Sequence, residues 1–239
     1  MTIIWLSIIT FVANLIGTII GFGVSTIMIP ILVLFYPFSQ VLLLVGILHL
    51  FSNISKITLF KHGIDWKLII AFGMPGIIAT TIGALLSVQE PQEFLARTLG
   101  IFLMTYAIFI LLNPTFQIKK HISYAIIGGA ISGFLAGIFG FRGAIRSSFL
   151  SIFNLPKDVF IATGSAIALL IDMVRVSVYW TQGSRLTVIP LWALGLLILI
   201  SWIGAFTARY VVRIIPQTNF RPVVIFFLLV MSIKLVFFS

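Results

Sequence analysis

Two arginines inside an apolar, glycine-rich segment are the first candidates for chemistry in this chain. Arg142 and Arg146 belong to the stretch GGAISGFLAGIFGFRGAIRSSFLS at residues 128–151, whose first sixteen residues include six glycines. A charged side chain at the centre of a bilayer costs about 2.5–3.5 kcal/mol on insertion scales, so such residues usually face a cavity or a partner. Four residues apart, the two arginines share one face of a helix. Their forked donors suit oxyanions, which makes the pair a candidate anion site.

The glycines indicate that the helix which must position these arginines is interrupted. Glycine lets a backbone bend or approach another backbone closely. The half-helix after such a break has N–H groups without intrahelical partners and a partial positive charge, which together favour an anion. We predict a broken or re-entrant helix whose break holds an anion near Gly140, Gly143 and Ser147. The alternative is that the arginines only pack or donate to backbone carbonyls.

Composition places the whole chain in the membrane. Of its 239 residues, 61% are hydrophobic and 8% are charged, and the mean hydropathy is +1.24. Apolar runs of about twenty residues, the length of a membrane-crossing helix, cover almost all of it. The formal charge of +10 comes mostly from residues that cap these runs, so topology explains it and nucleic acid is not expected as a partner. We predict an all-α polytopic membrane protein surrounded by lipid.

The apolar runs fall into two similar halves. Each half begins with a run too long for one crossing of about twenty residues and continues with three runs of ordinary length. The first half has runs at about 2–36, 39–60, 67–88 and 94–112, and the second at about 122–155, 159–180, 186–212 and 220–238. We expect a first membrane repeat at 1–113, a cytoplasmic linker at 114–121 and a second membrane repeat at 122–239, forming one integral membrane domain.

An offset of 119 residues relates the two halves. Pro37 and Pro156, which each close an opening run, are separated by 156 minus 37, or 119 residues. The same offset gives further pairs: Gly21 with Gly140, Asn53 with Asp172, Lys56 with Arg175, and Phe60 with Tyr179. The common order and spacing of these pairs predict a duplicated unit of four elements.

Positive charges at the ends of the runs favour an inverted arrangement of the halves. If every run crosses once, eight crossings leave little charge bias between the two faces. If each opening run enters and leaves on the same face, each half has three crossings and the second half is inverted. One face, cytoplasmic by the positive-inside rule, then carries Lys61, Lys67, Lys119, Lys120, Lys157, Arg209, Arg213 and Arg221. Because inverted repeats with discontinuous helices recur in secondary transporters, we prefer six crossings, two re-entrant elements and both termini outside.

Four further titratable residues are candidates for the site. Lys56 and Arg175 lie near the ends of their runs, so snorkelling to the interface competes with a role in binding, and their match under the repeat favours binding. Asp172 is the only acid inside an apolar run, three residues before Arg175. An ion pair on one helix face is the favoured interpretation, and a proton-coupling carboxylate is the alternative. His49 is a second coupling candidate, although a hydrogen bond to a backbone carbonyl is favoured.

The first opening run supplies the counterpart of the second break. Gly21 and Gly23 allow the bend, and Gly23 stands where the second half has Arg142, so the positive charge comes from one half only. Ser25 and Ser147 follow the two breaks and are candidate donors to an oxyanion. Small hydroxyl residues also pack helices together, which is the alternative for both serines.

Glycines at four-residue spacing form a second pattern within the same stretch. Gly129, Gly133 and Gly137 predict a close-packing stripe. Its partner is either another helix of this chain or a second subunit, so a homodimer stays open.

Several kinds of chemistry have no motif here. There is no Walker loop, no set of paired inward carboxylates, no His and Glu metal pattern and no Ser/His/Asp arrangement. The chain also has no cysteine, which excludes disulfides, thiolate metal sites and iron-sulfur clusters. We therefore expect no catalytic residue, no metal and no cofactor, and the chain is not expected to be an enzyme.

The two opening segments resemble those of the TauE/SafE sulfite-exporter family. They read GTIIGFGVSTIMIP at residues 17–30 and GFLAGIFGFRG at residues 133–143, similar to the family's Gly-x-Gly-Gly-Gly run that is followed by Pro and Leu. The first copy has Val24 and Ser25 in place of glycines, and the second has Arg142 in the run and Phe149 where the proline would be. The resemblance covers the whole chain. It implies a transporter that moves sulfite, organosulfonates or related small oxyanions across the bacterial inner membrane.

These observations together predict a secondary transporter, with export favoured over uptake. The small anion would lie near the midplane between the two breaks, held by Arg142, with Arg146, Lys56 and Arg175 as secondary charges. A passive anion channel is the nearest alternative, because a positive constriction also suits conduction. A membrane-embedded enzyme acting on lipid phosphates is disfavoured, because Asp172 is the only intramembrane acid.

Overall fold

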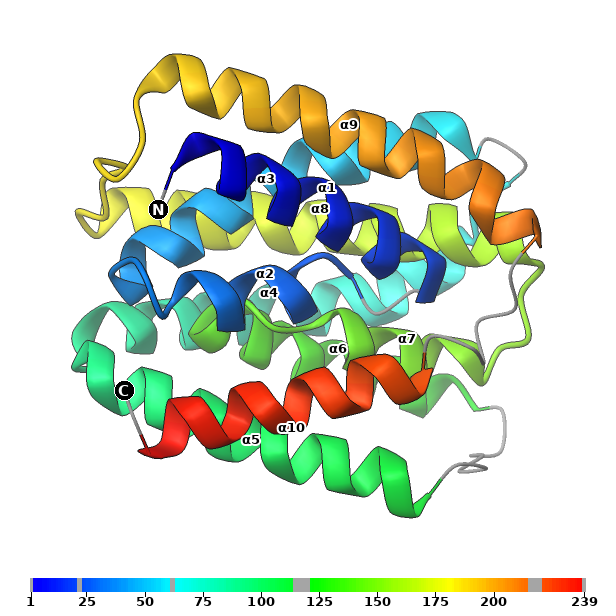
Figure 1. Ribbon diagram of the computed structural model, residues 1–239. Coiled ribbons are helices and arrows are strands. Elements are labelled where there is room, and N and C mark those ends of the chain that lie inside the picture. The colour runs from blue at the N-terminus through cyan, green and yellow to red at the C-terminus, as the bar shows by residue number, and fades with distance from the viewer. Residues whose placement is uncertain (1, 21–22, 61–62, 114–120, 215–220, 238–239) are drawn as a thin grey trace.

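A computed structural model describes residues 2–20, 23–60, 63–113, 121–214 and 221–237. Within these ranges the chain is all-helical, as the sequence predicts (Figure 1). The helices are α1 (Ile3–Ile20), α2 (Ser25–Leu32), α3 (Phe38–Leu59), α4 (Trp66–Gln89), α5 (Gln92–Leu112), α6 (Ile122–Phe139), α7 (Gly143–Ser151), α8 (Lys157–Thr181), α9 (Leu191–Ile214) and α10 (Arg221–Phe237).

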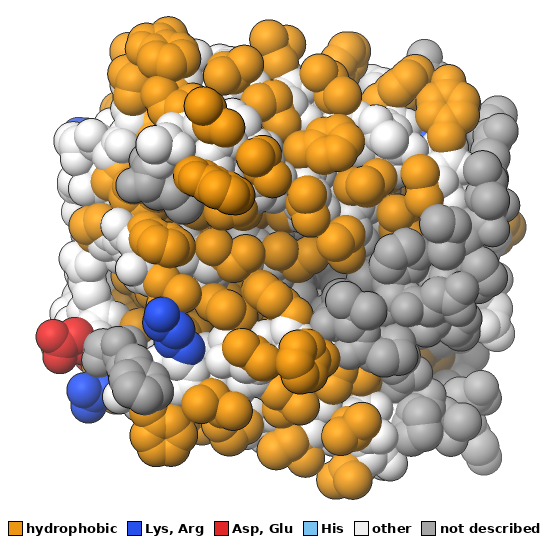
Figure 2. Space-filling model, in the orientation of Figure 1, with side chains coloured by type: hydrophobic (Ala, Val, Ile, Leu, Met, Phe, Trp, Pro, Cys, Tyr) orange, Lys and Arg blue, Asp and Glu red, His pale blue; other side chains and the backbone are white. Residues whose placement is uncertain are grey.

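The long helices are suited to a lipid environment. Among the described residues, α3, α4, α5, α6, α8 and α9 are long and apolar enough to cross a membrane, and shorter apolar helices lie in α1 and α10. The face in Figure 2 is covered mostly by hydrophobic side chains. A monomer in water rarely exposes apolar surface on this scale. The prediction of a multi-pass helical membrane protein is confirmed.

Both opening runs form broken helices. α6 ends at Gly140, whose φ of 69° is left-handed and whose N–H bonds the carbonyl of Ala136. Gly23, just before α2, has a φ of 85°. Glycine adopts these conformations without a steric penalty, and other residues do not. The half-helices α2 and α7 have 8 and 9 residues, about 12 to 14 Å at 1.5 Å per residue, so neither spans a bilayer.

Each broken helix folds back toward the end of the molecule from which it came. In Figure 1, α1 starts at the left end, and α2 begins near the middle and returns to the left. α6 starts at the right end, and α7 returns to the right. The amino and carboxyl ends of the chain both lie at the left. Both half-helices therefore have their N-termini near the middle of the bundle.

Helix packing follows the correspondence between the halves. The 119-residue offset relates α1 to α6 and α3 to α8, and the order of the helices in the two halves relates α4 to α9 and α5 to α10. α4 packs on α6, and their counterparts α9 and α1 also pack together. α4 packs on α8, as α9 packs on α3, and the related pairs α3 with α8 and α5 with α10 each pack together. An exchange of the two halves therefore reproduces these contacts.

The glycine stripe on α6 faces α4 of the same chain. A side chain at Gly133 would lie 2.7 Å from the Cα of Gly76, and one at Gly137 would lie 2.6 Å from the backbone nitrogen of Ala84. The Thr80 hydroxyl also donates to the Gly133 carbonyl at 2.7 Å. The absence of side chains lets the two backbones touch, as in other small-residue membrane contacts. The stripe thus has an intramolecular partner and does not require a second subunit.

Candidate functional site

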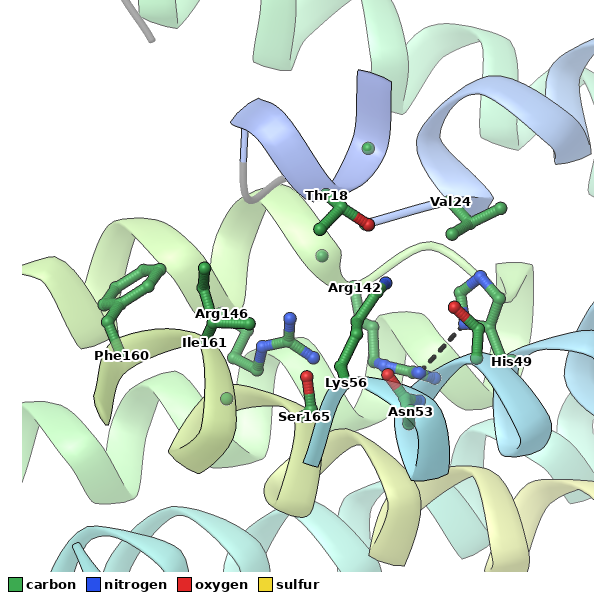
Figure 3. A pocket seen from close by; sticks show the side chains of 15 residues that line it. Thr18, Val24, His49, Asn53, Lys56, Arg142, Arg146, Phe160, Ile161 and Ser165 are labelled. Atoms are coloured by element: carbon green, nitrogen blue, oxygen red, sulfur yellow. Dashed lines mark hydrogen bonds between the residues drawn. The ribbon is translucent and has the colours of Figure 1, made fainter. Parts of the chain in front are cut away.

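A pocket lies between the two helix breaks and is bounded by five parts of the chain. Its lining is Gly17 and Thr18 of α1, Gly23 and Val24 of the first break, His49, Ser52, Asn53 and Lys56 of α3, Arg142, Gly143 and Arg146 at the second break, and Phe160, Ile161, Gly164 and Ser165 of α8. Figure 3 shows the side chains of Lys56, Arg142 and Arg146 together between His49 at one end and Phe160 at the other. The pocket thus joins residues from both halves around a group of cations.

Arg142 is held by the one buried carboxylate of the site. Its two terminal nitrogens, Nη1 and Nη2, donate to the two oxygens of Asp172. Arg142 is 1% exposed and Asp172 is fully buried. A forked pair of this type fixes the guanidinium plane as well as its charge. Asp172 therefore orients Arg142 at the wall of the pocket.

Asp172 is shared by a second arginine and an amide. The Arg175 Nε donates to it at 2.7 Å, and the Asn53 side-chain nitrogen donates to it at 2.8 Å. The ion pair on one helix face that the sequence favours is therefore present, and it extends to a second helix. Asn53 and Asp172 are 119 residues apart, so two residues paired by the repeat offset touch each other directly.

His49 closes the end of the pocket next to Arg142. Its Nδ1 lies 3.0 Å from the Arg142 Nη2 and 3.8 Å from Asp172. The expected hydrogen bond to a backbone carbonyl is not found among its described contacts. The Nδ1 atom faces the guanidinium of Arg142 instead. The other ring nitrogen, Nε2, is buried without a partner among the described residues.

Two further cations of the pocket have no counter-charge. Lys56 is 6% exposed, and Arg146 is half-buried with an unpartnered Nε. Within the described part of the chain, Asp172 is the only acid that forms ion pairs in this region, and neither side chain pairs with it. Uncompensated charge away from water is costly. The net positive charge of the pocket therefore favours an anion.

The two helix N-termini add partial positive charge. Gly23 and Val24 precede α2, and Arg142 precedes α7 with Gly143 as its first residue. A Cβ on Gly23 would lie 3.2 Å from the Gly143 Cα, so the breaks approach closely. The first N–H groups of a helix lack intrahelical acceptors. The Thr18 hydroxyl, also at the pocket, has no partner among the described groups.

The predicted site residues divide into two groups. Arg142, Arg146, Lys56, Gly23, Gly143 and His49 line the pocket. Arg175, Asp172, Gly140, Ser25 and Ser147 do not line it. Asp172 and Arg175 lie behind Arg142, Gly140 caps α6, and the two serines are buried within their half-helices. Gly21 lies outside the described residues.

Sequence reasoning missed several polar and small residues of the pocket. Asn53 was recognised only as the repeat partner of Asp172, and its side chain donates a hydrogen bond to that carboxylate. Ser52 binds the Asn14 side chain at 2.8 Å and so ties α3 to α1. Ser165 lies seven residues before Asp172 on α8, and this spacing puts both on one helix face. A helical-face analysis of α8 starting from Asp172 would have found it.

The pocket is small in this conformation. Its volume is about 30 Å³, and one water needs roughly 10–15 Å³ of such volume. It has room for about two water-sized groups. A larger anion requires the neighbouring helices to move apart.

Metal binding has no support in the described residues. They contain no group of three or more His, Cys, Asp or Glu side chains that could hold a metal ion.

Long apolar helices around a buried cationic pocket define an integral membrane protein. A family model described as sulfite exporter TauE/SafE matches residues 6–235. The chain therefore belongs to the sulfite exporter TauE/SafE family, as the resemblance of its opening segments implies.

One relative supports the same class. The chain is 28% identical over 155 residues to a probable membrane transporter protein of Methanocaldococcus jannaschii. The match covers 59% of this chain and 58% of that relative's length. Both the family and this relative are described as transporters and not as enzymes. No solved structure matches the chain.

Proposed function

We propose that this protein is a secondary transporter of small oxyanions, such as sulfite or an organosulfonate, that binds the anion between the two helix breaks. Lys56, Arg142 and Arg146 would hold it by charge. Gly143 and Gly23 would bring the two helix N-termini close to its oxygens. We further propose export across a bacterial inner membrane, following the family description.

One observation carries the proposal most directly. The pocket contains three cationic side chains, Lys56, Arg142 and Arg146, and Arg175 lies behind it; among the described residues of this region, Asp172 is the single carboxylate against these four charges. A structural ion-pair network would balance its charges, since a buried unpaired charge is strongly unfavourable. A site that receives an anion has a reason to leave cations unpaired. Arg142 and Asp172 form the fixed part of the site, and Lys56 and Arg146 the part open to the ligand.

The repeat suggests how the site would open to the two faces of the membrane in turn. Inverted repeats typically place the substrate at their interface and move one half against the other. The direct Asn53–Asp172 contact and the exchangeable helix pairs support such a duplication, with the repeats at 1–113 and 122–239. Alternating access would then come from rocking of these two units about the anion.

The test compares the unpaired cations with an exposed one. We expect the Lys56→Met variant to unfold at a higher temperature than the wild type in anion-free buffer, because a buried unpaired charge is removed. The same variant should lose the thermal stabilisation by sulfite or methanesulfonate that mass action gives the wild type. Arg146→Gln should weaken anion binding by roughly thirtyfold, or about 2 kcal/mol. Lys67→Met, at the exposed start of α4, is the control and should change neither property.

The outcome that contradicts the proposal is equally specific. If Lys56→Met and Arg146→Gln both keep the wild-type anion shift, the pocket is not the binding site. Acetate and chloride, tested in parallel, show whether the thermal shift requires a sulfur oxyanion or follows from general charge screening.

Counterflow distinguishes a transporter from a passive channel. In proteoliposomes loaded with unlabelled sulfite, we expect transient accumulation of labelled sulfite that saturates with concentration. A positive channel would conduct but would show no counterflow. The same vesicles with an imposed pH gradient test coupling to protons, for which Asp172 and His49 are the candidates.

A further inference from the structure

We propose that Arg175 forms a second anion-binding position, separate from the pocket, that takes the same small oxyanion when the protein opens toward the opposite membrane face. This inference rests on the proposed transport function. It assigns to Arg175 a role distinct from that of Lys56, with which it is paired by the repeat offset.

Arg175 is buried with unused donors. It is 0% exposed, and its only hydrogen bond to Asp172 uses the Nε. Its two terminal nitrogens, Nη1 and Nη2, have no hydrogen-bond partner among the described residues. The Tyr179 hydroxyl, one turn along α8, lies near the guanidinium and interacts with it, and it donates its own hydrogen to the Gly137 carbonyl. The forked end of the guanidinium is therefore available to a ligand.

Glycines on two other helices border the free end of Arg175. A Cβ on Gly140 would lie 3.0 Å from the Arg175 Nη1, and a Cβ on Gly46 would lie 3.8 Å from its Nη2. The same Cβ on Gly140 would lie 2.9 Å from Leu42. The guanidinium end thus lies beside two glycines, between α3 and the end of α6, with the side chains of Ile29, Leu42 and Val176 packed close to them. The region is closed in this conformation, and these side chains would have to move aside to admit an anion.

The repeat explains why this region matches the pocket. The 119-residue offset pairs Lys56 with Arg175, and it pairs the pocket residues Ile161 and Ser165 with Leu42 and Gly46. The contact between Asn53 and Asp172, another such pair, lies between the two regions. Arg175, Leu42 and Gly46 therefore surround a closed counterpart of the pocket that Lys56, Ile161 and Ser165 line.

The two regions lie toward opposite ends of the bundle. The pocket includes Lys56 near the end of α3 and Phe160 near the start of α8. Arg175 lies near the end of α8, and Leu42 lies near the start of α3. Since α3 and α8 run in opposite directions in Figure 1, both Arg175 and Leu42 lie toward the left end. An anion released by the pocket would thus reach Arg175 on its way to the other face.

Cysteine labelling tests this arrangement directly, because the wild-type chain has no cysteine. Ile161→Cys reports on the pocket, and Leu42→Cys, its repeat partner, reports on the second position. In oriented vesicles, we expect a membrane-impermeant thiol reagent to modify Ile161→Cys from one face and Leu42→Cys from the other. Sulfite should change both rates. Leu103→Cys, fully buried on α5, is the control and should stay unmodified from either face.

Substitution of Arg175 separates binding at the pocket from transport. We expect Arg175→Gln to keep stabilisation by sulfite in detergent and to lose counterflow by about tenfold or more, equivalent to about 1.4 kcal/mol. Arg175→Lys, which keeps the charge, should recover part of the counterflow. Lys56→Gln should lose both properties.

The outcomes distinguish the two proposals. If wild-type protein shows neither stabilisation nor counterflow with sulfite, the transport function itself is wrong. If wild-type protein transports sulfite but Leu42→Cys is unreactive from both faces, or reacts from the same face as Ile161→Cys, the second position is wrong. Normal counterflow in Arg175→Gln would also overturn it.

Discussion

Asp172 is the residue on which the arrangement of the site depends. One carboxylate accepts from Arg142, Arg175 and Asn53, which belong to three different elements of the chain. Each carboxylate oxygen can accept more than one hydrogen bond, and the two oxygens together can accept the forked donors of a guanidinium. The pocket side of Arg142 and the free end of Arg175 are therefore oriented by the same group.

The loss of this carboxylate charge should destabilise the protein strongly. In Asp172→Asn, two buried guanidinium groups lose their counter-charge, and breaking a buried pair in this way costs about 3–5 kcal/mol. Thermal unfolding in detergent measures the effect. Asn53→Ala is the matched comparison, because it removes one hydrogen bond to the same carboxylate and should cost about 1 kcal/mol. Equal stability of the two variants would show that Asp172 does not hold the arginines together.

The sequence predicted the charged residues of the site better than its neutral ones. Arg142, Arg146 and Lys56 stand out because cations are rare in apolar runs and must have a partner or a cavity. Ser25 and Ser147 were predicted as donors because they follow the two breaks, but they are buried in their half-helices and do not line the pocket. Hydroxyl side chains are common in membrane helices for packing alone, so their type says little about their position.

At the scale of elements, the two breaks follow from local sequence. Gly23 and Gly140 both adopt positive φ, and the unusual length of each opening run had already predicted an interruption of the helix. Pro30 lies inside α2 and did not mark its end. Local sequence therefore indicated that each run is broken, while the helix boundaries depended on the packing around them.

The contact between α4 and α6 should be intolerant of any added side chain. In Gly133→Val, the new Cβ would lie 2.7 Å from the Gly76 Cα, and overpacking of this kind typically costs about 1–3 kcal/mol. Thermal unfolding and yield of folded protein report the effect. Gly195→Val on α9 is the control, because nothing lies within 4 Å of a Cβ there. If Gly133→Val proves as stable as Gly195→Val, the two helices do not pack as described.

At the scale of the whole molecule, the two chain ends and the basic starts of α4 and α8 lie at opposite ends of the bundle (Figure 1). The starts of α4 and α8, which carry Lys67 and Lys157, lie at the right in Figure 1, and both chain ends lie at the left. The segment between α8 and α9, which carries Arg185, lies at the left of Figure 1 with the α4–α5 connection. From the positive-inside rule we expect the right end to be cytoplasmic.

Labelling of single cysteines at these ends tests the topology. We expect Lys67→Cys and Lys157→Cys to react with an impermeant reagent only after cells are permeabilised, and Arg185→Cys to react in intact cells. Eight crossings would instead put Lys67 and Arg185 on one face and Lys157 on the other. Labelling of Lys67→Cys and Lys157→Cys from opposite faces would therefore reject the re-entrant arrangement.

The sequence alone determined the membrane setting and the presence of cations inside apolar runs, and it predicted a two-part organisation. These properties follow from hydropathy, spacing and the cost of charge in lipid, all of which are local. Only the tertiary structure decided that Asp172 serves two arginines, that the glycine stripe meets α4, and that Arg175 stands apart from the pocket. These facts depend on which helices pack together, and the sequence does not show which residue pairs with a given buried charge.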